Sequence, residues 1–120
     1  MDIVAPSSIV NNAANNYIYV TSAGSNRVSV INGTTNTVVE NILVGLRPNG
    51  ITYDQSKGNV YVANSMNETI SVIDGLTNYV TDTIALGTNN TPNGVLYNPD
   101  IDSLFVADTN SSTAHVIKNR

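Results

Sequence analysis

The sequence predicts an all-β fold made of nearly three copies of one four-stranded unit. A short motif supplies the first observation: Asn16–Val20 recurs as Gly58–Val62 and again as Asp102–Val106, 42 and then 44 residues later. Composition supplies the second, because the 19 Asn suit turns and the 13 Thr suit strands. The third is that no stretch shows the 3.6-residue period of an amphipathic helix.

Other landmarks keep the same spacing. Val28–Gly33 matches Ile70–Gly75, and Pro48–Tyr53 matches Pro92–Tyr97. The two extra residues of the second spacing lie in Thr88–Thr91, a predicted turn in which insertions are well tolerated. Four-stranded blades of β-propellers repeat at about 40–50 residues, so this period predicts propeller blades.

The central unit shows the expected elements in order. Runs of strand-forming residues between polar turns predict strands over residues 50–53, 59–63, 69–73 and 79–86. In the turn before the last strand, Asp74 can cap backbone N–H groups, and Gly75 can adopt a positive φ at little cost. Extended to its neighbours, the pattern predicts one partial propeller over residues 1–120, with blades at about 6–47, 48–91 and 92–120.

The outer units depart from this pattern. The first opens with Pro6-Ser7-Ser8-Ile9 and lacks the glycine found in the other two. The third stops after its third strand, and the register places only Met1-Asp2 over the end of a fourth, so we expect eleven of twelve strands. The strand at Thr113–Lys118 should therefore have a bare edge, which His115 and Lys118 would protect from aggregation.

Stacked blades explain the composition of the middle strands. Residues 17–20 and 28–31 are near-continuous apolar runs, as expected of strands buried on both faces. The small residues Ala63, Ser71 and Ala107 are expected on the crowded side of the blades near the axis.

Composition and charge exclude several classes of partner. Charged residues make up 12% of the chain, the net charge is −4, and the five basic residues are scattered, which argues against nucleic acid or an anionic membrane. The absence of Cys excludes disulfides and thiolate metal sites. No apolar run approaches the ~18 residues of a membrane-spanning helix. Residues 1–10 do not resemble a secretion signal.

The repeat resembles a known family. Tyr19-Val20-Thr21-Ser22, Tyr61-Val62-Ala63-Asn64 and Phe105-Val106-Ala107-Asp108 look like the Tyr-Val-Thr-Asn motif of YVTN-type β-propeller repeats. Val72–Asn78 and the Pro-Asn-Gly openings at 48 and 92 are similar to further segments of that repeat. The resemblance covers about residues 6–118. It implies a propeller of the kind found in surface-layer and exported proteins, and more loosely lactonase-like and streptogramin-lyase-like propellers, but it transfers no catalytic residue.

Three blades are too few for a closed ring, since propellers typically have about 4–8. The first and last blades would each expose an apolar face. Such exposure costs a free energy of about 25 cal/mol for every Å² of apolar surface. We therefore expect either a homo-oligomer closed head to tail, with a dimer of six blades favoured, or a longer propeller of which this chain is a piece.

Few residues are candidates for chemistry. His115 is the only histidine and has no second His or Cys to complete a metal site. Asp100 and Asp102 could offer oxygens to Ca²⁺, but an ordinary hairpin turn explains them better. No nucleophile elbow and no phosphate-binding glycine loop occurs. The sequence therefore predicts no catalytic, metal or cofactor-binding residues and no cofactor.

Four Asn-x-Ser/Thr sequons fall in predicted turns, where glycan acceptors lie in exported proteins. The candidate glycosylation sites are Asn32, Asn67, Asn89 and Asn110. In a chain this rich in Asn and Thr, chance also explains them.

These observations favour a non-enzymatic scaffold or interaction module of a cell-surface or exported protein, with a protein or glycan partner. Asn49, Asn93, Asn64 and Ser22 could present hydrogen-bonding groups around the axis, although they could equally serve only to make turns. Two alternatives stay open: a fragment of a propeller hydrolase or lyase, for which Asp108 and His115 would be the residues to test, and an excised or engineered repeat fragment that self-assembles.

Overall fold

The computed structural model describes residues 2–118, which form eleven strands and no helix, and so none that could cross a membrane. The strands are β1 (Pro6–Asn12), β2 (Tyr17–Ser22), β3 (Arg27–Asn32), β4 (Thr37–Leu43), β5 (Pro48–Asp54), β6 (Asn59–Asn64), β7 (Thr69–Asp74), β8 (Val80–Ala85), β9 (Pro92–Asn98), β10 (Ser103–Asp108) and β11 (Thr113–Lys118). The all-β prediction and the count of eleven strands are confirmed.

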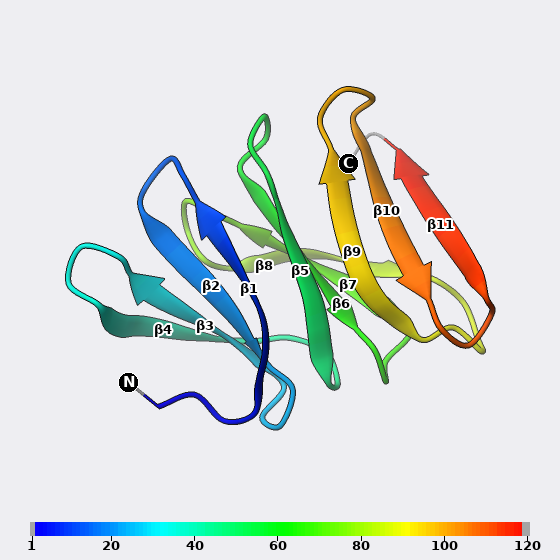
Figure 1. Ribbon diagram of the computed structural model, residues 1–120, viewed down its shortest axis with the longest axis horizontal. Helices are drawn as coiled ribbons and strands as arrows, with labels where there is room; N and C mark the ends of the chain where they lie inside the picture. The colour runs from blue at the N-terminus through cyan, green and yellow to red at the C-terminus, as the bar shows by residue number, and fades with distance from the viewer. Residues whose placement is uncertain (1, 119–120) are drawn as a thin grey trace.

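The strands form three antiparallel sheets in sequence order: blade 1 (β1–β4), blade 2 (β5–β8) and blade 3 (β9–β11). In each blade neighbouring strands pair as an up-and-down meander. The first strands stand side by side, with β5 packed against both β1 and β9, while the later strands run outward from them (Figure 1). Each sheet is thus a propeller blade, and the third lacks an outer strand within the described residues.

Asparagine makes many of the turns between strands. Asn16, Asn36 and Asn78 have φ angles of 61°, 59° and 62°, in the left-handed region that Asn tolerates better than most residues. Gly75 does not use the positive φ that glycine allows, and Asn78 takes that conformation in its turn. Glycine is required at position 75 for a different reason: a Cβ there would lie 2.6 Å from the carbonyl oxygen of Gly58.

The core lies between blades, in two layers. The first junction packs Tyr19, Val28, Val30 and Ile42 of blade 1 against Ile51, Val60, Val62 and Ile73 of blade 2. The second junction packs Tyr61, Ala63, Ile70 and Val72 of blade 2 against Tyr97, Leu104 and Val106 of blade 3. Blade 2 is therefore buried on both faces. The apolar runs at residues 17–20 and 28–31 predicted this for the middle strands of blade 1, but among the described residues blade 1 packs against another blade on one face only.

Blades 1 and 3 each have only one neighbour among the described residues. Ala63 and Ser71 are buried as expected, but Ala107 is exposed because no described residue packs over that face of blade 3. Among residues 2–118, the strand β11 has no partner on its outer edge, as predicted. His115 does not stand out from this edge. It is half-buried and points back toward Asp108.

Candidate functional site

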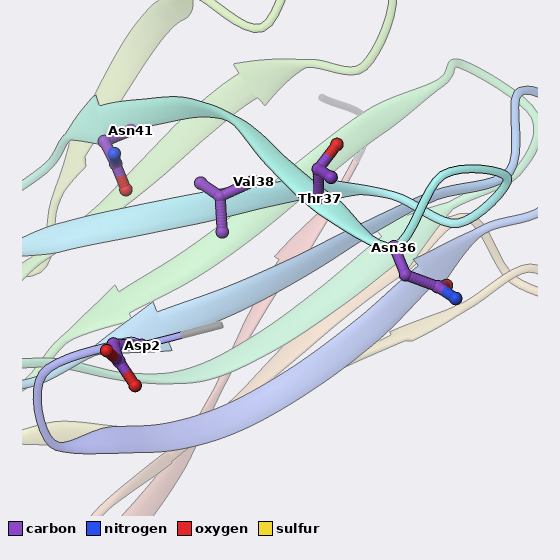
Figure 2. Close-up of a pocket in the computed structure, with 5 residues that line it drawn as sticks. All are labelled: Asp2, Asn36, Thr37, Val38 and Asn41. Carbon is purple, nitrogen blue, oxygen red and sulfur yellow. The ribbon is translucent and has the colours of Figure 1, made fainter.

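Three features could carry function: a hollow on blade 1, a groove where blades 2 and 3 meet, and a polar cluster at their opposite end. The hollow has a volume of about 540 Å³ and is lined by Asp2, Asn36, Thr37, Val38 and Asn41. Figure 2 shows that four of these side chains come from β4 and the turn before it, with Asp2 entering from the N-terminal segment. Its walls carry one carboxylate and otherwise neutral groups.

The groove has a volume of about 300 Å³. It lies at the end of blades 2 and 3 at which the chain passes from the outer strand β8 to the inner strand β9. It is lined by Ser65, Met66, Glu68, Asn89, Asn90, Thr91 and Asn110. Its chemistry is that of amides and hydroxyls, with one thioether and one carboxylate. Such a surface can exchange hydrogen bonds with a neutral polar ligand, but it offers little to a charged one.

Asp108 and His115 meet beside this groove. The Nε2 of His115 lies 3.1 Å from Oδ2 of Asp108 and 3.2 Å from Oδ1 of Asn90. Both oxygens are acceptors, so this nitrogen carries a proton and donates. Asp108 is buried and ends β10, while His115 lies on the neighbouring strand β11 and is half-buried. The strand pairing brings the two residues together, and the Asp–His pair has the form of a catalytic dyad.

The carboxylate of Asp108 is held mainly by backbone donors. Burial alone would raise the pKa of Asp108, but hydrogen bonds from the N–H groups of Thr91 and Ser111, from His115 and from the N–H of Asn110 outweigh it and lower the pKa well below its usual range. Hydrogen bonds from backbone N–H groups of this kind are typical of an aspartate that closes a turn. The charge is stabilised by the fold and is not poised to accept a proton near neutral pH.

The opposite end of the second junction carries the polar cluster. The Tyr97 hydroxyl donates to Oδ1 of Asp102 at 2.6 Å, and Lys57 Nζ lies 3.2 Å from the same oxygen. The hydrogen bond from Tyr97 lowers the pKa of Asp102, with help from Lys57, and raises the pKa of Tyr97. Asp102 thus links blade 2 to blade 3. It does not converge with Asp100, whose N–H instead donates to the side chain of Asn98.

No metal site is assembled within residues 2–118, where no group of three or more His, Asp or Glu side chains lies close enough to share an ion. Over the same residues every buried side-chain nitrogen and oxygen has a hydrogen-bond partner. The polar interior is therefore satisfied by the protein itself.

The Asn and Ser side chains expected around the axis divide into two groups. Asn64 and Ser22 are buried: Asn64 donates to Thr69 and Ser71, and Ser22 donates to the carbonyl oxygen of Val4. Asn49 and Asn93 sit on the innermost strands, and the amide of Asn49 donates to Asn93 across the second junction. The first pair serves the blades internally, and only the second lies where it could face a channel.

The four sequon asparagines lie at a strand end or in turns. Asn67, Asn89 and Asn110 are exposed, while Asn32 is half-buried at the end of β3. The Oδ1 of Asn32 accepts the Thr34 N–H, and the amide nitrogen of Asn110 donates to the carbonyl oxygen of Asn89 at 2.6 Å. Their glycosylation stays a prediction.

Solved structures share this arrangement of blades. Hydrazine synthase from Kuenenia stuttgartiensis superposes with a TM-score of 0.78 over 99% of the chain, at 19% sequence identity. Dihydro-heme d1 dehydrogenase NirN in complex with DHE superposes with a TM-score of 0.75 over 98% of the chain, at 16% identity. Both are β-propeller proteins. The fold is that of β-propeller blades.

The likeness is one of fold alone. The chain spans 37% of the length of the hydrazine synthase chain and 25% of the length of the NirN chain. No family model and no curated protein matches the sequence.

Proposed function

We propose that the chain is a non-enzymatic β-propeller module that serves as a scaffold or interaction surface in a cell-surface or exported protein. The observation that carries this proposal is the use made of its ionisable side chains. Asp54 and Asp108 close turns, Asp102 links two blades, and His115 donates to Asp108. Groups engaged in this way stabilise the blades and are not presented to a substrate.

The motifs at Tyr19–Ser22, Tyr61–Asn64 and Phe105–Asp108 support membership of the YVTN-type repeats. That resemblance underlies the assignment to a surface-layer or exported protein.

The groove between blades 2 and 3 is the contact surface that we assign to this module. Its amides and hydroxyls suit a neutral partner, such as a glycan or an uncharged protein loop. Met66 adds an apolar contact, since its side chain is 67% exposed. The repeated end loops of the blades would widen this surface in a complete ring.

A binding experiment tests this assignment. Neutral glycans and a panel of uncharged peptides would be screened against the wild-type chain, Met66→Ala and the control Leu76→Ala. Leu76 is likewise an exposed apolar residue, but it lies in a turn at the other end of blade 2. We expect Met66→Ala to weaken binding at least several-fold while Leu76→Ala leaves it unchanged. Equal binding by all three proteins would remove the groove from the proposal.

The second candidate function is that of a propeller hydrolase or lyase fragment, and the Asp108–His115 pair is the observation in its favour. A panel of lactone and ester substrates, with metal analysis of the purified chain, separates the two candidates. We expect no turnover above the buffer rate. Turnover that disappears in both His115→Ala and Asp108→Asn, with both variants folded, would replace the scaffold proposal with the enzymatic one.

A further inference from the structure

Two faces of the molecule have no blade packed against them. On blade 1 the side chains that alternate with those of the first junction point away from blade 2, and we call this the leading face: Ile9, Ile18, Val20 and Ile31. On blade 3 the corresponding set points away from blade 2, and we call this the trailing face: Leu96, Phe105, Ala107, Ala114 and Val116. Ile9 is 64% exposed and Leu96 is 62% exposed, whereas Val20 and Ile31 of the leading face are already buried within the single chain.

These faces are the two halves of one blade junction. The repeat aligns the leading residues Ile9, Val20 and Ile31 with Ile51, Val62 and Ile73, which form the blade 2 side of the first junction. It aligns the trailing residues Phe105, Ala107 and Val116 with Tyr61, Ala63 and Val72, which form the blade 2 side of the second junction. Each open face thus has the apolar pattern that another blade covers elsewhere in the chain.

The hollow in Figure 2 belongs to the leading face. Its residues Asn36, Val38 and Asn41 occupy the repeat positions of Asn78, Val80 and Thr83. In blade 2 those three residues line grooves shared with the outer strand of blade 1. The hollow therefore lies where the outer strand of a preceding blade would pack, the strand that blade 3 lacks among the described residues.

The N-terminal segment also has the form of a connection from another blade. Ala5 has a φ of 46° and its carbonyl oxygen accepts the Ala23 N–H at 3.0 Å. Arg47, its counterpart between blades 1 and 2, has a φ of 52° and accepts the Ser65 N–H at the same distance. The chain thus enters blade 1 in the same way as it enters blade 2.

We propose that the trailing face of one copy binds the leading face of a second copy, and that two copies joined in this way close a ring of six blades. A junction between two different faces closes when the rotation completes a circle. Two copies give six blades, inside the usual range of about 4–8, whereas three copies would give nine. We choose a second copy as the occupant because the two faces match. Its trailing face has the apolar residues that pack against a leading face inside the chain, and its leading face has those that pack against a trailing face.

Association is expected to depend on concentration. The exposed area of the chain, 6188 Å², is close to the ~6,200 Å² typical of a folded monomer of 12.7 kDa. A single copy can therefore exist in dilute solution, and the driving force for pairing is the apolar character of the two faces.

A charge-swap experiment tests the pairing, with mass measured by size-exclusion chromatography and light scattering. In the second junction a Cβ at position 50 would touch Val95 N, and Thr52 accepts the Tyr97 N–H. By repeat equivalence, Ile9 of one copy lies between residues 94 and 96 of the next. Ile9→Lys and Leu96→Glu each place a charge at a position that is exposed in one copy and buried in the ring.

We expect the wild-type chain at high concentration to have twice the mass of 12.7 kDa, and each variant alone to have the mass of one copy. Mixing Ile9→Lys with Leu96→Glu should restore the doubled mass, because one junction then pairs Lys with Glu and the other is wild type. Leu76→Lys, which lies on neither face, should behave as wild type. Circular dichroism confirms that every variant is folded.

Three results would overturn the proposal. The first is a wild-type mass of one copy at every concentration, and the second is a mass of three copies or more. The third is a mixture of the two charged variants that does not recover the doubled mass.

Discussion

At the scale of single residues, one position of the repeat shows how the chain changes chemistry without changing structure. Asn64 ends β6 and donates to Ser71 on the next strand at 2.9 Å. At the matching place in blade 3, Asp108 ends β10 and accepts from His115 at 3.1 Å. A neutral amide–hydroxyl pair has become a carboxylate–imidazole pair. The backbone N–H groups around Asp108 make this replacement tolerable, because they stabilise the buried charge.

Asp108→Asn should lower the free energy of unfolding at pH 7 by about 1–2 kcal/mol, since charge-assisted hydrogen bonds from the turn are lost. The pKa of Asp108 is lower in the folded chain than the ~3.9 of an unfolded Asp. Its contribution is therefore fully present above about pH 5 and is lost as the pH falls through 3.9 toward the folded value. Urea unfolding between pH 7 and pH 2 measures this.

The matched control is Asp100→Asn, at an exposed carboxylate in the turn at the other end of β10. It should leave both the stability and its dependence on pH nearly unchanged. The free energy of unfolding of Asp108→Asn could instead fall as much between pH 5 and pH 2 as that of the wild type. The prediction that this carboxylate stabilises the fold would then be wrong.

The sequence directed attention to His115 because it is the only histidine, but it did not predict the Asp108–His115 contact. The strand register that joins them follows from the turn at 109–112, whose length alone does not fix which side chains share a face. The repeat contained a signal that was missed. Asn64 and Ser71 are one strand apart at the same repeat positions, and Asp108 and His115 replace them both.

At the scale of strands, the repeat predicted the elements well. Expected strands at 59–63 and 69–73 correspond to β6 and β7, which each extend one residue further. The strand expected at 50–53 is longer, because pairing begins at Pro48 and passes an irregularity before Ile51. A local pattern cannot predict such a bulge, since it depends on how the neighbouring strand is paired.

Gly50 is required by the approach of blades 2 and 3. A Cβ at position 50 would lie 2.4 Å from the carbonyl oxygen of Asn93 and 2.9 Å from the Cα of Gly94. These are backbone atoms, so relief requires the two inner strands to separate. Gly50→Ala should therefore lower the free energy of unfolding by about 1–3 kcal/mol, the usual range for overpacking.

Gly94 provides the matched control, because the nearest atom to a Cβ there is the Cβ of Ala107 at 3.8 Å, an ordinary contact. Both substitutions would be made in the Ile9→Lys background, so that association does not contribute. Denaturant unfolding should then show a loss for Gly50→Ala and nearly none for Gly94→Ala. Equal losses would mean that glycine at position 50 serves the strand conformation and not the contact between blades.

At the scale of the whole molecule, the sequence predicted blades and their number, but for the outer two faces it left a second copy of the chain and further blades of a longer chain as alternatives. The apolar pattern in Phe105–Val106 and in Ile18–Val20 is the same whether a strand faces another blade of its own chain or a blade of another copy. The hydrophobic effect has no direction and does not identify the partner. The structure adds the geometry of the two junctions between blades within the chain. From these, the register of a third junction, between two copies, can be derived.

That register can be tested by cross-linking, because the chain contains no cysteine. Thr52 on β5 accepts the Tyr97 N–H on β9 at 3.2 Å, so these two positions are direct neighbours across the second junction. Their repeat equivalents are Leu96 on the trailing face and Asn11 on the leading face. In the proposed ring, Leu96 of one copy therefore lies beside Asn11 of the other.

The double variant Asn11→Cys/Leu96→Cys should consequently form disulfides between copies under mild oxidation, since a disulfide needs Cα atoms about 4.4–6.8 Å apart and these positions are expected to be direct neighbours. A non-reducing denaturing gel should show a band at twice the mass of the chain, and reduction should abolish it. Asn11→Cys/Leu76→Cys places the second thiol on neither open face and should cross-link far less at equal concentration. Similar yields from both double variants would indicate random collision, and the register derived from the internal junctions would then be wrong.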